Sequence, residues 1–385
     1  MIPYGRQHIS DADIEAVVAV LKSDFLTQGP AVPEFEAAVV AYSGARYAVA
    51  VNSATSALHI ACMALDLGPG DWLWTSPNTF VASANCARYC GASVDFVDID
   101  PGTYNMSPEA LARKLARAKA AGRLPKVVVP VHFAGQSCDM RAIRALADEF
   151  GFSIIEDASH AIGGRYLDEP VGNCRFSDIT VFSFHPVKIV TTGEGGMAVT
   201  NSGKLAESLR LFRSHGVTRD VSRYEGESEG GWYYQQTTLG YNYRLTDLQA
   251  ILGVSQLRQI DTFVQRRHAI ASRYDAALAR LPLTVPSPAP EAFSALHLYP
   301  IVLHDVSQRR AVYDGLRSGG IAVNVHYIPV HLQPYYRRLG FRPGDFPVAE
   351  AYYAGAISLP IYFDLTDDLQ ERVIAALVNV CSRLC

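Results

Sequence analysis

One lysine in this sequence has surroundings that suit nucleophilic chemistry. Lys188 lies between an apolar segment at 179–184 and a glycine-rich loop at 193–196. The apolar residues Val187 and Ile189 flank it. Such neighbours keep water away from the ammonium group and lower its pKa, so the free amine can react with an aldehyde or ketone. A lysine that extends its charge from a strand end into water fits the same stretch. The lysine alone leaves both interpretations open.

Two features upstream could complete a site around this lysine. Residues 53–56, Ser-Ala-Thr-Ser, follow a short apolar segment at 47–51 and precede a helical pattern. Free backbone N–H groups and hydroxyls at such a helix start can bind a phosphate. Asp157 directly follows another predicted strand, 152–156. Each feature has a structural alternative, because serine, threonine and aspartate are also common helix caps.

Taken together, these features match what pyridoxal 5'-phosphate requires. A lysine bonds to the cofactor aldehyde, a carboxylate pairs with the pyridine nitrogen, and a helix N-terminus binds the phosphate. Phe80 adds an aromatic side chain that could stack on the cofactor ring, although a single phenylalanine is more often part of a core. The set favours an enzyme over a non-catalytic binding protein, which would be expected to lack Lys188 or Asp157.

Composition and charge exclude several other classes of function. The chain has 385 residues and a net charge of −4, with no long basic run, which argues against nucleic acid or an anionic membrane as the main partner. No apolar run has the length of a membrane span, and no signal-peptide pattern opens the chain, so a cytoplasmic protein is expected. The 7 cysteines are scattered, without a C-x-x-C pair, which predicts neither a structural metal nor a disulfide framework.

The elements that must position the site follow an α/β rhythm. Apolar segments alternate with helical patterns, which predicts a mostly parallel sheet covered on both faces. Ligands bind at the carboxyl ends of strands in such sheets. We expect a large domain at 1–254 that includes the N-terminal segment, and a smaller C-terminal α/β domain at 255–385. Finer expectations are a helix at 78–90 and a helix from Thr246 to Leu257, with a continuation towards 280 left open.

Several motifs together resemble the fold-type I, aspartate-aminotransferase-like enzymes, and among them the DegT/DnrJ/EryC1/StrS family of nucleotide-sugar aminotransferases. The motifs span almost the whole chain and lie at 26–29, 52–58, 156–161, 183–188, 191–196, 213–216 and 240–245. Two further stretches, 74–85 and 323–331, are most similar to the branch of the family that serves pseudaminic acid synthesis.

The resemblance implies roles for individual residues of a homodimer with shared active sites. Lys188 would be the catalytic lysine. The cofactor would be bound by Ala54, Thr55, Phe80, Asp157, His160, Ser183 and, from the neighbouring subunit, Asn242. The nucleotide sugar would be bound by Tyr4, Asp24, Phe25, Leu26, Thr27, Asn324, Val325, His326 and Tyr327.

The resemblance also implies the reaction. L-Glutamate would give its amino group, through the cofactor, to C4 of a UDP-linked 4-keto-6-deoxy-N-acetylhexosamine. The main alternative is a sister aminotransferase acting on a different 4-keto or 3-keto sugar. A dehydratase branch of the family has histidine in place of the lysine, and Lys188 argues against it. The residue that binds the glutamate carboxylate stays open, with Arg213 and Arg244 as candidates.

Overall fold

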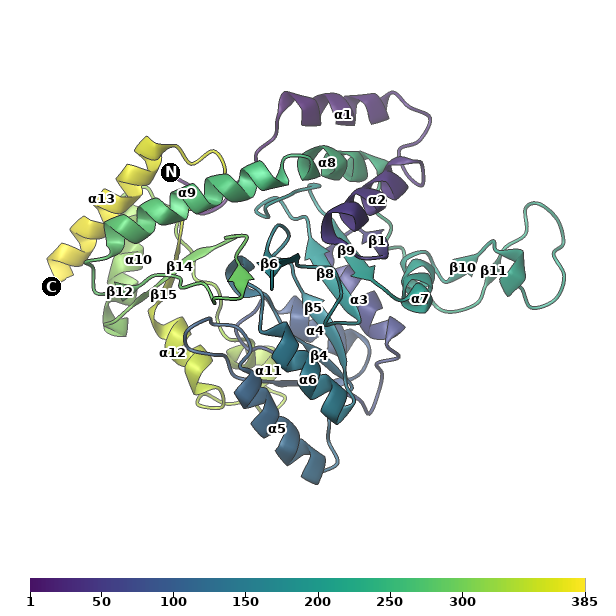
Figure 1. The fold of residues 1–385 in the computed structure, drawn as a ribbon, viewed down its shortest axis with the longest axis horizontal. Coiled ribbons are helices and arrows are strands. Elements are labelled where there is room, and N and C mark those ends of the chain that lie inside the picture. The colour runs from purple at the N-terminus through teal and green to yellow at the C-terminus, as the bar shows by residue number, and fades with distance from the viewer. Residues whose placement is uncertain (385) are drawn as a thin grey trace.

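A computed structural model describes residues 1–384, and Figure 1 shows its elements. The α-helices are α1 (Asp11–Leu21), α2 (Ala31–Ser43), α3 (Ala54–Ala64), α4 (Ala82–Tyr89), α5 (Pro108–Ala120), α6 (Met140–Phe150), α7 (Gly203–Arg213), α8 (Asp247–Leu257), α9 (Ile260–Leu278), α10 (Arg309–Ser318), α11 (Pro334–Arg337), α12 (Pro347–Gly355) and α13 (Asp367–Leu384). The strands are β1 (Tyr47–Val51), β2 (Trp72–Thr75), β3 (Ser93–Phe96), β4 (Val127–Val129), β5 (Ser153–Asp157), β6 (Arg165–Tyr166), β7 (Glu169–Pro170), β8 (Ile179–Ser183), β9 (Gly196–Thr200), β10 (Val217–Thr218), β11 (Gln235–Gln236), β12 (Leu283–Thr284), β13 (Ala292–Phe293), β14 (Tyr299–Leu303) and β15 (Ala356–Leu359).

The main sheet of the described chain has seven strands in the order β1-β9-β8-β5-β4-β2-β3. The pairs from β8 to β3 are parallel, and only β9 runs against its neighbours. The reversal has a simple cause. No helix separates β8 from β9, and Ser183 pairs directly with Gly196, so the chain turns back on itself instead of making a crossover. The predicted α/β fold with a mostly parallel sheet is confirmed.

Helices cover both faces of this sheet, which explains why its strands are apolar throughout. On one face, α3, α4 and α7 enclose a cluster that includes Val181, Ala198 and Leu209. On the other face, α2 and α8 pack over the β9 end around Phe182, while α5 and α6 pack over the β4 end around Val128. The central strands β8 and β9 are buried along their whole length.

The C-terminal part of the chain builds a separate apolar cluster. The strands β12, β14 and β15 form an antiparallel sheet, and residues of α9, α10 and α13 pack on it, among them Tyr274, Leu316 and Leu377. Ile2 joins this cluster and pairs with Ile321. The predicted boundary after residue 254 falls within α8, and the division into two domains stays a prediction.

The structure defines the bounds of two expected helices. The helix expected at 78–90 begins only at Ala82, because the preceding residues form a turn in which Thr79 Oγ1 bonds Ser83 Oγ at 2.8 Å. The helix expected from Thr246 to Leu257 is α8, with Thr246 as its N-cap. It does not continue towards 280 as one helix, since α8 packs on α1 and α2 whereas the separate helix α9 packs on α13. A hairpin of β10 and β11 projects from the body of the molecule (Figure 1).

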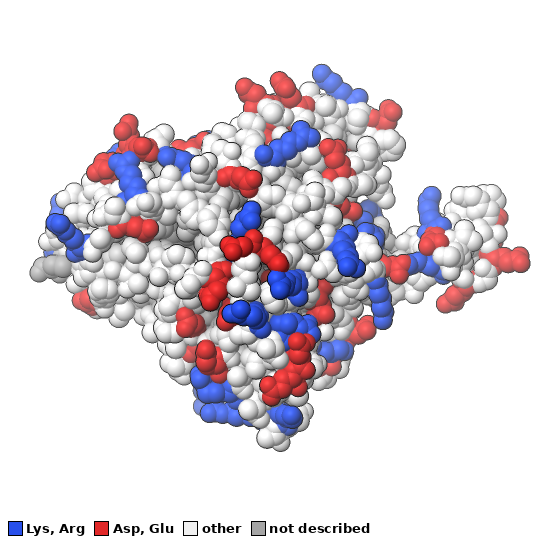
Figure 2. Space-filling view, viewed as in Figure 1, with Lys and Arg blue, Asp and Glu red and all other residues white. Residues whose placement is uncertain are grey.

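Surface charge is mixed on the face that Figure 2 shows. Lysine and arginine alternate there with aspartate and glutamate, without a large patch of one sign. Such a surface provides no extended electrostatic footprint for a polyanion. Within residues 1–384, no helix is long and apolar enough to cross a membrane.

One buried carboxylate joins the start of the chain to α8 and gives a test of the fold. Asp247 is 1% exposed and accepts the N–H groups of Gly29 and Ala31 at 2.8 and 2.9 Å. We predict that Asp247→Ala lowers the free energy of unfolding by about 1–3 kcal/mol, because it leaves buried donors without an acceptor. Urea denaturation followed by tryptophan fluorescence measures the change. Glu227→Ala, on the exposed hairpin, is the control, and equal stability of the two variants would contradict the account.

Candidate active site

Lys188 lies in the loop that joins β8 to β9, and this loop is pinned to the strand ends. Phe184 donates its N–H to Gly195 O at 2.9 Å and accepts from Thr192 N at 3.0 Å, and Lys188 N–H donates to His185 O at 2.8 Å. The side chain enters a cavity. Burial there lowers the pKa of Lys188 from 10.5 to about 8, while the charge of Asp157 acts in the opposite direction. With this pKa about a tenth of the amine is unprotonated at pH 7, far more than for an ordinary lysine.

Asp157 ends β5, the parallel neighbour of β8, and its carboxylate is fixed from several sides. It is 4% exposed, and its Oδ2 accepts the Ser83 hydroxyl at 2.6 Å. Its Oδ1 accepts Ser159 N–H at 3.1 Å. Its backbone bonds Pro130 O and His132 N at 2.9 and 3.0 Å. No lysine, arginine or histidine of the described chain forms an ion pair with it, so the carboxylate is available to a cationic ligand group.

The N-terminus of α3 lies where the sequence predicts phosphate binding. Ser53 caps the helix by accepting Ser56 N–H at 3.1 Å. Ser53, Ala54 and Thr55 line the cavity together with Ser183, and the first N–H groups of a helix lack partners within it. The start of β9 packs tightly under the cup, because a Cβ on Gly196 would lie 2.5 Å from Ala54 N. Glycine is required there by close approach.

His160 and Tyr327 face each other across the cavity wall. Their atoms Nε2 and Oη are 3.1 Å apart. His160 is 6% exposed, and burial together with the charge of Lys188 lowers its pKa well below the ordinary value. Its Nδ1 is buried without a hydrogen-bond partner. Phe80 lines the same cavity and is 58% exposed, with its ring 6.4 Å from the ring of Tyr327.

Residues from the C-terminal part and from the N-terminus complete the wall. His326 Nδ1 bonds Ser358 Oγ at 2.8 Å, and the ring of Tyr4 lies 5.3 Å from the ring of His326. Burial and then the charge of Lys188 lower the pKa of His326 to about 4. The imidazole is therefore neutral at physiological pH, and Asn324 and Val325 stand beside it on the wall.

All these side chains surround one cavity of about 690 Å³, within the range of about 300–1,000 Å³ that ligand sites occupy. The predicted site residues that line it are Tyr4, Ala54, Thr55, Phe80, Asp157, His160, Ser183, Lys188, Asn324, Val325, His326 and Tyr327. Residues from distant parts of the sequence therefore meet at one cavity. For Lys188, Asp157 and the start of α3, the strand ends and the helix cap predicted this meeting.

Five predicted site residues do not reach this cavity in a single chain. Asp24, Phe25, Leu26 and Thr27 are exposed at the connection of α1 and α2, where Leu26 O accepts the N–H of Asp247 at 2.9 Å. Asn242 is also exposed and pairs with Ser214. One isolated chain therefore does not bring these five residues to the cavity.

Sequence reasoning missed other residues of the site. Ser83 donates to Asp157, and its place within the motif at 74–85 was the available signal. His185 and Glu194 also line the cavity and lie 4.0 Å apart. The candidates for binding the donor carboxylate lie elsewhere. Arg213 pairs with Glu36, and Arg244 donates to Ser214 Oγ at 3.3 Å.

The residues of the cavity fit pyridoxal 5'-phosphate. Asp157 is a buried carboxylate without a cationic partner among the described residues, as a protonated pyridine nitrogen would require. The first N–H groups of α3 that Ser53 does not bind suit a phosphate. Lys188 supplies an amine with a lowered pKa. When bound, the cofactor serves as a sink for the electrons released at the substrate carbon. The chain contributes binding, orientation and proton transfer.

Comparisons with known proteins agree with this geometry. The model of the DegT/DnrJ/EryC1/StrS aminotransferase family matches residues 7–378. The chain is 40% identical to the spore coat polysaccharide biosynthesis protein SpsC of Bacillus subtilis, over 98% of this chain and 97% of that protein. It is similar to Helicobacter pylori PseC, an aminotransferase involved in pseudaminic acid biosynthesis, at a TM-score of 0.91 and 31% identity over 99% of both chains.

A third similarity concerns the cofactor. The putative sugar aminotransferase Spr1654 of Streptococcus pneumoniae is known in a form with pyridoxal phosphate, which has a TM-score of 0.90 and 30% identity and covers 100% of this chain and 99% of that one. A form of the same protein with the amine state of the cofactor has a TM-score of 0.91. Pyridoxal phosphate is accordingly the cofactor of this family of enzymes.

The lowered pKa of Lys188 gives a pH test. The neutral amine is the reactive form, and its fraction rises with pH to half at about pH 8. We predict that the rate at which cofactor-free protein captures pyridoxal phosphate rises with pH and levels off above about 8, as stopped-flow visible absorbance would show. Lys188→Ala should abolish capture, and Lys204→Ala, on the exposed face of α7, should not. A rate still rising at pH 10 would contradict the account.

Asp157 gives a second test. Asp157→Asn keeps the shape of the side chain and removes its charge. We predict that cofactor affinity falls at least about thirtyfold, since breaking a buried, hydrogen-bonded charge pair costs roughly 2–5 kcal/mol. Fluorescence titration of the cofactor-free protein measures this loss. Ser83→Ala, which removes one hydrogen bond to the same carboxylate, should lose less, and an Asp157→Asn variant with native affinity would rule out the pairing.

Proposed function

The chain belongs to the DegT/DnrJ/EryC1/StrS aminotransferase family, and from that premise we propose a specific reaction for this pyridoxal-phosphate-dependent sugar aminotransferase. The donor is L-glutamate. The acceptor is UDP-2-acetamido-2,6-dideoxy-β-L-arabino-hexos-4-ulose, aminated at C4. The product is UDP-4-amino-4,6-dideoxy-N-acetyl-β-L-altrosamine, an intermediate of pseudaminic acid synthesis. The similarity to PseC and the motifs at 74–85 and 323–331 support this choice of substrate.

The observation that carries the proposal is the meeting of Lys188 and Asp157 in one cavity with the α3 N-terminus. Lys188, once free, is the base that removes the proton of the donor and returns one to the sugar carbon, and a pKa of about 8 suits transfer in both directions near neutral pH. Asp157 holds the cofactor nitrogen in its protonated state. Because Lys188 approaches from a fixed loop, it delivers the proton to one face of the sugar.

The lining of the cavity supports a sugar as the acceptor. Tyr4, Asn324 and His326 line the cavity with a phenol, an amide and a neutral imidazole. Such groups bind sugar hydroxyls without requiring a charge on the ligand. Phe80 and Ile328 add apolar surface at the same wall. This composition suits a polar, uncharged ring better than a second carboxylate.

The lining of the cavity supports a homodimer with shared sites. Among the described residues that line the cavity, none is an arginine. Asn242 and residues 24–27 are exposed and do not line the cavity of their own chain. We infer that they serve the site of a second copy, with Asn242 at the cofactor phosphate and residues 24–27 at the nucleotide sugar.

A sister activity is the second candidate, and one finding favours it. The relative with 40% identity takes part in spore coat polysaccharide synthesis, whereas PseC has 31% identity. A different 4-keto or 3-keto nucleotide sugar would use the same Lys188 chemistry, so only the residues around the sugar distinguish the two functions.

The experiment is a competition between acceptors. Enzyme supplied with L-glutamate is offered UDP-linked 4-keto N-acetyl sugars of either C5 configuration and dTDP-linked 3-keto and 4-keto sugars, and amino-sugar products are identified by mass spectrometry and NMR. We predict that the named UDP sugar has the highest kcat/KM, by at least about tenfold, because polar groups matched to one substrate are left unpaired by the others. Preference for a dTDP or 3-keto sugar would establish the sister activity instead.

A further inference from the structure

A second histidine lies directly behind His160. The ring centroids of His160 and His297 are 4.5 Å apart, with 47° between the ring planes. His297 is 4% exposed and does not line the cofactor cavity. Nothing in the chemistry described above uses it. Its place, packed against a residue that faces the cofactor, makes it a candidate for positioning that residue.

Both rings carry an unsatisfied nitrogen at the same position. His160 Nδ1 and His297 Nδ1 are buried and have no hydrogen-bond partner. A buried polar atom without a partner costs about 1–3 kcal/mol, so two such atoms on adjacent rings favour a bond between them. The structure shows no bond between the two nitrogens. With ring centroids 4.5 Å apart, such a bond requires a reorientation of the His297 ring while the His160 ring keeps its place. His160 Nε2 is already engaged with Tyr327 Oη at 3.1 Å.

The charge states of the two rings suit such a bond. Burial and the charge of Lys188 lower the pKa of both histidines well below the ordinary value, and Arg267 adds to the effect on His297. His326, the other imidazole that faces this region, also has a lowered pKa. A neutral imidazole has one donor and one acceptor nitrogen. One ring can therefore donate to the other without a buried charge.

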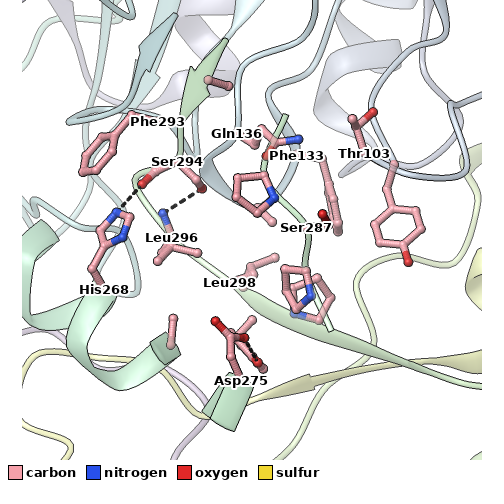
Figure 3. Close-up of a pocket in the computed structure, with 18 of the residues that line it drawn as sticks. Thr103, Phe133, Gln136, His268, Asp275, Ser287, Phe293, Ser294, Leu296 and Leu298 are labelled. Carbon is pink, nitrogen blue, oxygen red and sulfur yellow. Dashed lines mark hydrogen bonds between the residues drawn. The ribbon is translucent and has the colours of Figure 1, made fainter. Parts of the chain in front are cut away.

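The backbone of His297 is held rigidly enough to fix its ring. Arg267 Nη1 donates to the carbonyl oxygens of Leu296, His297 and Ile361 at 3.1, 3.2 and 3.1 Å. Figure 3 shows the preceding residues pinned in the same way, with His268 Nε2 bonded to Ser294 O at 2.8 Å and Leu296 N–H donating to Ser294 Oγ at 3.1 Å.

The segment is also confined from two other sides. A Cβ on Gly135 would lie 2.8 Å from Leu296 N and 3.1 Å from His160 O, so this turn packs against both histidine segments. Phe133, Leu296 and Leu298 face a separate cavity of about 240 Å³ (Figure 3). His297 is therefore carried on a rigid wall between that cavity and the cofactor site.

We propose that His297 is a positioning residue whose Nδ1–H donates to His160 Nδ1. This bond fixes His160 as the tautomer that carries its proton on Nε2, the nitrogen beside Tyr327 Oη. The Nε2–H group is then a donor for the ring oxygen of the bound cofactor, and second partners set imidazole tautomers in this way at many sites. The inference rests on the cofactor-binding role of His160 within the proposed function, and it is independent of which sugar is the acceptor.

Three variants separate the hydrogen bond from packing. His297→Asn keeps an N–H near the position of Nδ1, His297→Leu removes it, and His268→Asn disturbs the same segment without contacting His160. The readout is the pH midpoint of the visible absorption of the bound cofactor, measured without substrate. We expect His297→Leu to shift the midpoint by about one pH unit, since one hydrogen bond is worth about 1 kcal/mol and one unit is 1.36 kcal/mol. The Asn variants at 297 and 268 should stay near the native midpoint.

Two further measurements make the proposal falsifiable even if His297→Leu does not fold. In ¹⁵N-histidine-labelled protein loaded with cofactor, His160 should be the Nε2–H tautomer, and an Nδ1–H tautomer would overturn the proposal. In a His160→Gln background, His297→Ala, which also lacks the N–H group, should leave the midpoint unchanged, and the same shift with and without His160 would overturn the proposal. Equal midpoints for His297→Leu and native protein would also overturn it. Failure to aminate a UDP sugar would leave these spectral results unaffected, so the two hypotheses fail separately.

Discussion

The enclosure of the Lys188 amine beside the Asp157 carboxylate is the constraint on which the rest of the site depends. An ammonium group in a cavity loses hydration, and this loss lowers the pKa of Lys188 to about 8. A carboxylate in direct contact would cancel the effect, so the two groups must be near each other without pairing. The sheet provides this arrangement. β5 and β8 are parallel neighbours with Asp157 opposite Val181, and the loop after β8 carries Lys188 over the same edge.

The remaining polar groups of the described chain form no ion pair with Lys188 or Asp157, so the amine and the carboxylate stay available to ligands. The histidines at the wall, His160 and His326, have lowered pKa values because they are buried near the lysine, and they act as neutral hydrogen-bonding groups. Arg267 is buried nearby and donates its hydrogen bonds to backbone carbonyl oxygens. Its positive charge also contributes to the lowered pKa of the neighbouring His297, after burial and the charge of Lys188.

Much of this arrangement could be predicted from local patterns. Lys188, Asp157 and residues 53–56 follow apolar strands, and strand ends of a parallel sheet meet at one edge. The α/β fold itself follows from the alternation of apolar segments and helices. The order of strands was less accessible, because the reversal at β9 depends on a loop that closes directly onto its strand.

Other features depend on tertiary packing that no local pattern encodes. The bond from Ser83 to Asp157 joins a helix start to a distant strand, and the contact of His297 with His160 joins segments more than a hundred residues apart in sequence. The break between α8 and α9 follows from their different packing partners. Residues 24–27 and Asn242 were assigned by resemblance alone, and none of them lines the cavity of one chain. Their proposed place in the site of a second copy therefore has no signal in the local patterns of the sequence.

The most direct measurement is to identify the lysine that holds the cofactor. Protein loaded with pyridoxal phosphate is reduced with borohydride, which makes the bond between cofactor and lysine permanent, and is then digested and analysed by peptide mass spectrometry. The account predicts that the cofactor mass lies on Lys188 and on no other lysine in stoichiometric yield. A label on a different lysine, or no label on protein that has bound the cofactor, would contradict the central role given to Lys188.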